Sequence, residues 1–348
     1  MSYPLIILGA GASFDFLIRN DYPRDDTDLD RWIPPLTDNL FNGVQFQSLL
    51  SKYKEMNELV GYIRGKIRSN RQNVTFEGIL TKLYQDGVRS NPDLYKSFAA
   101  LLFYLCDLFG TVTEKYYRPH NNYDTLRHII SLNGNQAVFV NFNYDLFLER
   151  SFGKNNAERV DQYLEGNFPI VKIHGSYNWF WNRLVNAFAQ GKQDCYELSI
   201  KGAQYIFNPG DNIQKWELII YNNPNPQNIR AQRLDGLRAY SFHPALALPL
   251  IGKDNFVCPS SHVDFLRRKL KEIDRIVIIG WKMADPFMRG LLLEELKQRS
   301  IPITFVGGRN SKSLIDVLDK DIRQNLKLIN SNGFSNFISS DEGEGFFT

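Results

Sequence analysis

The sequence is poor in cysteine and has no long apolar run. Its 348 residues include only Cys106, Cys195 and Cys258, which form no Cys-x-x-Cys pair. This spacing excludes a disulfide framework and a four-cysteine zinc site, and it fits a reducing compartment. No apolar run reaches the roughly 20 residues of a membrane-spanning helix, and no basic region precedes the short apolar N-terminal stretch. We therefore expect a cytoplasmic protein that does not bind a membrane.

Charge of one sign is also scarce. The 41 basic residues against 38 acidic ones give a formal net charge of +3, which is too small to indicate a nucleic-acid partner. The basic run at 267–271 is flanked by Asp264, Glu272 and Asp274, as on a solvated helix face. The content of 43% hydrophobic and 14% aromatic residues predicts a well-packed globular protein. No direct contact with nucleic acid is expected.

Aliphatic runs at five places predict strands. They lie at 5–8, 137–140, 170–173, 276–280 and 303–308, and an amphipathic helix is predicted between the last two, over about 286–299. Continuous aliphatic strands are typical of a parallel sheet covered by helices on both faces. We expect an α/β fold with a Rossmann-like, doubly wound parallel sheet, which binds ligands at the carboxyl ends of its strands.

Two insertions are expected to interrupt this sheet. Apolar residues at three- and four-residue spacing predict a large helical insertion over 40–132. A second, irregular insertion over 177–262 is expected to close over the strand ends, with strands at 196–200 and 216–221 and an exposed loop at 222–228. The core would then comprise residues 1–39, 133–176 and 263–330. The acidic C-terminal tail, 331–348, is predicted to fray.

The first predicted strand runs into Gly9-Ala10-Gly11-Ala12-Ser13. Small residues between a strand and a helix let the backbone approach a pyrophosphate, whose charge the free N–H groups of the helix would face. The dehydrogenase fingerprint GxGxxG fails at its last position, where Phe14 stands. A hydride-transferring dehydrogenase is therefore disfavoured, whereas a dinucleotide ligand is not; a plain tight turn is the alternative.

Polar residues follow two further strands directly. Asn143 and Asp145 come after the strand at 137–140, and an extended backbone would project both to one side. His174 follows the strand at 170–173, where it could serve as a base near neutral pH. We expect these residues to meet the Gly9–Ser13 loop at one edge of the sheet. The other four histidines are assigned structural roles, and no grouping has the spacing of a metal site.

Taken in order, these motifs resemble the sirtuin-like domain. The resemblance rests on Gly9–Ser13, Pro35-Leu36-Thr37, Asn143-Tyr144-Asp145, His174-Gly175, and Gly280 with Asp285 and Gly307. It covers roughly 4–37, 137–176 and 274–310, and it looks most like the bacterial branch that destroys NAD in anti-phage defence. The zinc module and the Pro-Asp-Phe-Arg segment of protein deacetylases are absent from the sequence.

The resemblance implies specific site residues. Asn143, Asp145 and His174 would be catalytic, with Asn143 and Asp145 at the nicotinamide ribose and His174 as the base. No metal ligand is implied, and the residues expected to bind NAD are Gly9, Ala10, Gly11, Ala12, Ser13, Thr37, Gly280, Asp285 and Gly307.

The implied activity is that of an NAD glycohydrolase effector, with NAD as substrate and nicotinamide and ADP-ribose as products. Unrestrained NAD loss is harmful, so homo-oligomerisation or a separately encoded sensor or ATPase partner is expected to gate it. A non-catalytic subunit that senses NAD or ADP-ribose stays open as an alternative. So does a zinc-free NAD-dependent deacylase or ADP-ribosyltransferase. A linear or a cyclic product is compatible with the sequence.

Overall fold

The chain divides into two compact units. In this computed structural model, unit 1 comprises Met1–Leu36, Lys115–Gly175 and Gly252–Thr348, and unit 2 comprises Thr37–Glu114 and Ser176–Ile251. The structure describes residues 3–18, 27–69, 75–87, 91–132, 134, 136–186, 194–207, 216–222, 226, 229–234, 238–250, 257–308, 318–330 and 332–347.

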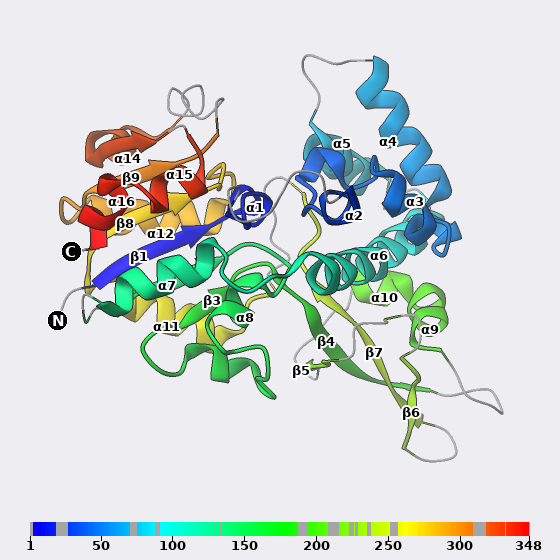
Figure 1. Ribbon diagram of the computed structural model, residues 1–348. Coiled ribbons are helices and arrows are strands. Elements are labelled where there is room, and N and C mark those ends of the chain that lie inside the picture. The colour runs from blue at the N-terminus through cyan, green and yellow to red at the C-terminus, as the bar shows by residue number, and fades with distance from the viewer. Residues whose placement is uncertain are drawn as a thin grey trace. The chain divides into compact units, whose positions relative to one another are not determined.

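Unit 1 is built on a parallel sheet with the order β10-β9-β8-β1-β2-β3 (Figure 1). Its strands are β1 (Tyr3–Leu8), β2 (Val138–Asn141), β3 (Ile170–Lys172), β8 (Ile273–Ile279), β9 (Ile303–Val306) and β10 (Leu326–Asn330). The first strand lies inside the sheet, where Leu5 pairs with Val138 on one side and Ile276 on the other. Later strands extend the sheet in both directions from β1, which confirms the expected doubly wound order.

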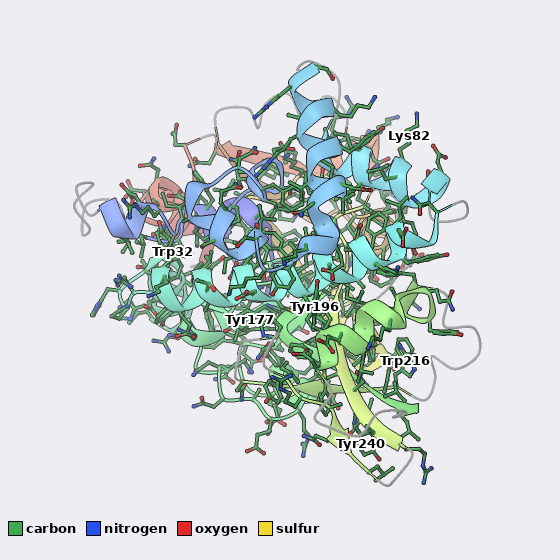
Figure 2. All side chains as sticks on the ribbon, turned by 90° about the vertical axis from the view of Figure 1, so that its right-hand side faces the viewer. Trp32, Lys82, Tyr177, Tyr196, Trp216 and Tyr240 are labelled. Carbon is green, nitrogen blue, oxygen red and sulfur yellow. The ribbon has the colours of Figure 1, made fainter. Side chains whose placement is uncertain are left out.

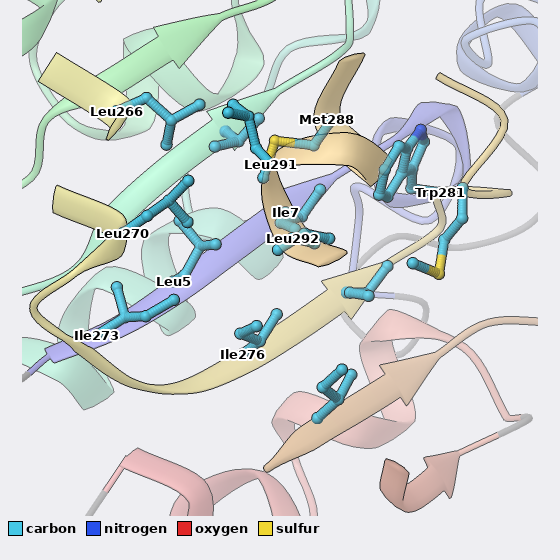
Figure 3. Close-up of a cluster of buried hydrophobic side chains, with 14 of the residues drawn as sticks. Leu5, Ile7, Leu266, Leu270, Ile273, Ile276, Trp281, Met288, Leu291 and Leu292 are labelled. Carbon is cyan, nitrogen blue, oxygen red and sulfur yellow. The ribbon is translucent and has the colours of Figure 1, made fainter. Parts of the chain in front are cut away.

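Unit 1 also contains several helical elements. They are α1 (Ala10–Phe14), α2 (Thr27–Asp30), α7 (Asn122–Leu132), α8 (Phe147–Ser151), η4 (Val160–Leu164), α11 (Ser260–Leu270), α12 (Pro286–Leu296), α14 (Lys320–Asn325), α15 (Phe334–Ile338) and α16 (Asp341–Phe347). The helix predicted over 286–299 is therefore confirmed as α12. Leucines of α11 and α12 pack on Leu5, Ile7 and Ile276 of the sheet (Figure 3). Burial of these aliphatic side chains stabilises the layer by about 1.5–3 kcal/mol for each one fully removed from water.

The C-terminal segment is ordered, contrary to the expected fraying. Strand β10 joins the edge of the sheet, and α15 and α16 follow it. Phe334, Phe337 and Ile338 are buried, and Ser335 Oγ donates to Asp15 Oδ1 at 2.8 Å. The charges at 341–344 suggested a tail, but the buried phenylalanines before them anchor the segment in unit 1.

Unit 2 combines helices with an antiparallel sheet of order β5-β4-β7-β6, formed by β4 (Gly175–Asn186), β5 (Glu217–Ile220), β6 (Gln232–Arg233) and β7 (Arg238–Leu246). The strand expected at 216–221 is confirmed as β5. Of the loop expected at 222–228, only Asn222 and Pro226 lie within the described residues. The helical elements are η1 (Thr37–Asn39), α3 (Val44–Leu50), η2 (Lys54–Met56), α4 (Asn57–Ser69), α5 (Phe76–Lys82), η3 (Leu83–Gly87), α6 (Pro92–Tyr116), α9 (Cys195–Lys201) and α10 (Ala203–Phe207).

Two elements of unit 2 differ from expectation. The strand predicted at 196–200 is wrong, because this segment forms α9. Asp194 caps that helix, and its side chain accepts a hydrogen bond from the Tyr196 N–H at 2.8 Å. Helix α6 contains a 24-residue stretch, Asp93–Tyr116, that is long and apolar enough to cross a membrane, yet 89% of its most apolar window is buried inside the protein. It is therefore a core helix.

Gly280 offers a direct test of the packing at the end of β8. Its φ is +62°, and a Cβ there would lie 2.3 Å from the Ala12 nitrogen. We expect Gly280→Ala to reduce the free energy of unfolding by at least about 2 kcal/mol, measured by urea denaturation. The control is Gly290→Ala in α12, where an added Cβ meets nothing within 4 Å. If Gly280→Ala lowers the free energy of unfolding by no more than Gly290→Ala does, the close backbone packing at Gly280 does not require glycine.

Candidate active site

The loops after β1 and β8 pack backbone against backbone. Gly9 N donates to Ile279 O at 2.9 Å, and Gly11 N donates to Gly280 O at 3.0 Å. A Cβ at Gly9 would lie 2.6 Å from Gly280 O, and one at Gly11 would lie 2.8 Å from Gly280 Cα. Close approach of the two strand ends is therefore sufficient reason for glycine at these positions. Ala12 is buried in this contact, whereas Ala10 is exposed.

Ser13 joins the first of these loops to the segment after β2. The Asn143 side chain donates through Nδ2 to Ser13 Oγ at 2.9 Å and to Gly9 O at 3.1 Å. Ser13 also hydrogen-bonds Asp145, and its Oγ lies 3.4 Å from the hydroxyl of Tyr123, which comes from α7. All four side chains are buried. The structure thus brings the predicted residues Gly9, Ser13, Asn143 and Asp145 together.

The reason for this meeting differs from the predicted one. Strand β2 ends at Asn141, and residues 142–146 form a turn, so Asn143 and Asp145 do not project from an extended backbone. The side chain of Asn141 accepts a hydrogen bond from the Asn143 N–H at 2.9 Å, and Asp145 Oδ1 accepts one from the Phe147 N–H at 3.2 Å. These bonds hold the turn, in which Asp145 is only 1% exposed.

Burial raises the pKa of Asp145 to about 6. The positive charge of Lys172 and the hydrogen bonds from Ser13 and Phe147 lower this pKa in part, while the carboxylate of Glu149 raises it further. Asp145 therefore titrates between its ordinary range and neutrality. It contacts Ser13 from inside the protein, and its predicted catalytic role stays a prediction.

Lys172 and Glu149 form an ion pair that the sequence analysis did not identify. Lys172 Nζ donates to Glu149 Oε1 at 2.9 Å and to the carbonyl oxygen of Asp145 at 2.8 Å, and both charged side chains are fully buried. Asn141 Nδ2 donates to the same Glu149 oxygen at 3.3 Å. The sequence feature that could have indicated this ion pair is the lysine within the aliphatic run 170–173, because a buried ammonium group requires an acidic partner.

His174 lies at the end of β3 and contacts Asp285. Its Nε2 is 3.1 Å from Asp285 Oδ2, and the imidazole is 26% exposed. Asp285 also caps α12, because its Oδ1 accepts a hydrogen bond from Met288 N at 2.8 Å. Asp285 was expected from the sequence to contact the ligand. The structure places its carboxylate beside His174.

The ring of His174 also packs against the turn that carries Asn143. Its centroid lies 4.9 Å from that of Phe142 and 6.5 Å from that of Tyr144. Phe142 in turn stacks on Trp281, next to Gly280, at 4.6 Å. His174 and Asn143 are thus on adjoining strand ends of unit 1 rather than on opposite sides of the molecule.

One predicted residue of unit 1 lies at another strand end, and one predicted residue belongs to unit 2. Gly307 follows β9, where its N–H donates to Asn330 O at 2.9 Å and its carbonyl oxygen accepts from Gly333 N at 3.0 Å. Thr37 begins η1 in unit 2, so its contact with the ligand stays a prediction. Within the described part of the chain, no group of three histidine, cysteine, aspartate or glutamate residues could hold a metal ion.

Solved structures similar to this chain are complexes of Sir2 homologues. One is a triple mutant bound to 2'-O-acetyl-ADP-ribose, at 11% identity and a TM-score of 0.43 over 99% of this chain and 91% of that chain. Another is an NAD complex, at 11% identity and a TM-score of 0.39 over 99% and 88%. No protein-family model and no curated protein matches the chain. The neighbours are of the family that the sequence resembles.

Stability should depend on pH through Asp145. Because its folded pKa, about 6, lies above the ordinary 3.8, its contribution to stability is full below about pH 4 and is lost as the pH rises through 6. Asp145→Asn removes this titration. Between about pH 4.5 and 7, the unfolding free energy of the parent should fall by about 2 kcal/mol relative to that of the variant, measured by urea denaturation. Exposed Asp264→Asn is the control, and a parallel pH dependence of parent and Asp145→Asn would exclude the shift.

The buried ion pair should show strong coupling. Glu149→Gln and Lys172→Met each leave one buried charge without its partner, so each should cost about 3–5 kcal/mol of unfolding free energy. The double variant should cost less than the sum, which a double-mutant cycle measures. The same cycle at the exposed pair Lys96–Asp93 should give at most about 1 kcal/mol. Additive losses at 149 and 172 would mean that the two charges do not stabilise one another.

Proposed function

We propose that this chain is an NAD glycohydrolase. The observation that carries the proposal is the contact between His174 and Asp285, on a strand end that adjoins the cluster of Ser13, Asn143 and Asp145. A doubly wound sheet binds its ligand at the carboxyl ends of its strands, and β1, β2, β3 and β8 all end here. The resemblance of these motifs to the sirtuin-like domain indicates NAD as the substrate.

The proposed reaction is hydrolysis of the bond between nicotinamide and ribose. NAD and water give nicotinamide, ADP-ribose and a proton. Nicotinamide leaves a cationic ring as a neutral molecule, so the leaving group needs no general acid. The protein must instead orient the ribose, tolerate positive charge at the reacting carbon, and accept a proton from water.

His174 is the proposed base. When the Nε2–H donates to Asp285, the lone pair of the imidazole is on Nδ1, and the carboxylate stabilises the imidazolium that forms. The partial exposure of the ring lets it reach a substrate. Asn143, Ser13 and Asp145 position the Gly9–Ser13 loop, on which the diphosphate and ribose of NAD are proposed to lie.

The biological role that we propose is that of a gated effector in bacterial anti-phage defence, as the resemblance implies. Gating would come from homo-oligomerisation or from a separately encoded sensor or ATPase. A non-catalytic NAD sensor and a zinc-free deacylase or ADP-ribosyltransferase are the competing functions. Nicotinamide release separates the sensor from the hydrolase, and release that does not need an acylated or acceptor protein separates the hydrolase from the other two enzymes.

The test is release of nicotinamide from NAD by the full-length protein, alone and with partners that co-purify from its native host. His174→Ala should lower the rate by about 10²–10⁴-fold, the range for a positioned acid–base group. Asp285→Asn should also lower it while leaving α12 intact, because asparagine caps a helix as well as aspartate does. Exposed His128→Ala is the control and should match the parent.

Three results would overturn the proposal. NAD binding without nicotinamide release under any partner condition would favour the sensor. Release that requires an acylated protein or a protein acceptor would favour the deacylase or the transferase. A folded His174→Ala protein that cleaves NAD as fast as the parent would remove the base assigned here.

A further inference from the structure

Unit 2 contains a cluster of polar groups on its antiparallel sheet that includes none of the residues assigned to NAD. Arg183 lies on β4, His243 on the neighbouring strand β7, and Trp216 directly before β5 on the other side of β4. Figure 2 labels Trp216 beside these strands. The Arg183 guanidinium carbon lies 4.6 Å from the Trp216 ring centroid, and the His243 ring is edge-on to Trp216 at 5.0 Å. One indole therefore contacts both groups.

Strand register explains why these side chains gather. Trp181 pairs with Leu218 and Asn182 with Glu217, so the register brings Trp216 opposite Arg183. Neighbours directly opposite in adjacent antiparallel strands project from the same face of the sheet. Trp181, two residues before Arg183, lies on that face too, with its ring centroid 6.4 Å from that of Trp216.

Two polar atoms of the cluster, one on each strand, are buried without a hydrogen-bond partner in the described part of the chain. Arg183 Nε and His243 Nε2 are both buried and have no hydrogen-bond partner among the described residues. His243 is only 2% exposed. Leaving such atoms unpaired is costly, because each has lost its water without gaining a hydrogen bond.

Among the described residues, no carboxylate is a cause of the pKa shift of Arg183. Burial lowers this pKa. Burial, together with the charge of Arg183, lowers the pKa of His243 well below its ordinary value, so the imidazole is neutral at pH 7. A half-buried guanidinium beside a neutral imidazole leaves a net positive charge, which an anion would balance.

We propose that Arg183 and His243 form a binding site for the phosphate group of a small ligand. The planar guanidinium matches phosphate oxygens in pairs, and neutral imidazole can donate one further N–H. Tetrahedral phosphate has enough terminal oxygens to accept from donors on two different strands at once, whereas a carboxylate lies in one plane. Trp216 and Arg183 are partly exposed, whereas Arg183 Nε and His243 Nε2 are buried, so a phosphate group reaches these two atoms only when a covering side chain moves. The site is independent of the proposed NAD chemistry.

The experiment is titration of the full-length protein with inorganic phosphate at constant ionic strength. The readout is the NMR signal of the His243 imidazole, identified by its loss in His243→Gln. We expect a saturable shift in the parent, and at least a tenfold weaker apparent affinity in Arg183→Gln. Exposed Lys201→Gln removes one positive charge from the same unit and should leave the titration unchanged.

Two further arms identify the ligand. Acetate should not reproduce the shift, and a response to acetate equal to that to phosphate would overturn the phosphate assignment. Adenosine monophosphate that binds more tightly than phosphate would identify a nucleotide, whose base could stack on tryptophan; equal affinity would identify the phosphate group alone. If the His243 NMR signal of the unmutated protein does not shift up to about 10 mM phosphate, the proposed site is wrong. This result needs no variant.

Discussion

The hydrogen bonds from Asn143 to Ser13 and Gly9 hold the candidate active site together. They tie the turn after β2 to the loop after β1, which itself packs on the loop after β8 through Gly9, Gly11 and Gly280. Three chain segments separated by more than 100 residues are thereby fixed at one edge of the sheet. Every role assigned to His174 depends on this arrangement, because its ring packs on the same turn, against Phe142 and Tyr144.

Buried charged groups hold this turn from the inside of the protein. Asp145 caps the turn from within, and Lys172 holds both its carbonyl oxygen and Glu149. Desolvation of two carboxylates and one ammonium is unfavourable, so the network exists at a cost in stability and contributes a specific geometry in return. These buried charges lie under the loops of the site, whereas the hydrophobic cluster of the sheet is built from aliphatic, aromatic and sulfur-containing side chains.

The sequence was sufficient to predict five of the six strands of this sheet and the convergence of their loops, because aliphatic runs that end in glycine or polar residues are typical of buried parallel strands. It did not predict the edge strand β10. It was insufficient for the details that depend on tertiary packing. Residues 196–200 have a strand-like composition, yet they lie in helix α9, which Asp194 caps. Strand periodicity does not explain why Asn143 and Asp145 meet Ser13, because the strand ends at Asn141. Both residues lie in a turn that local hydrogen bonds hold. The ion pair of Lys172 could not be predicted from local sequence, because its partner Glu149 lies 23 residues away.

The two oxygens of Asp285 link helix stability to the orientation of the proposed base. One oxygen accepts from the backbone of α12 and the other contacts His174. Capping holds the carboxylate in one position, so the imidazole meets a preorganised partner and little reorganisation is needed when it gains a proton. Asp285→Ala would remove the helix cap and the partner of His174 together, so a loss of activity could not be assigned to either one. Asparagine separates the two effects, because it preserves the cap while removing the charge that would stabilise an imidazolium.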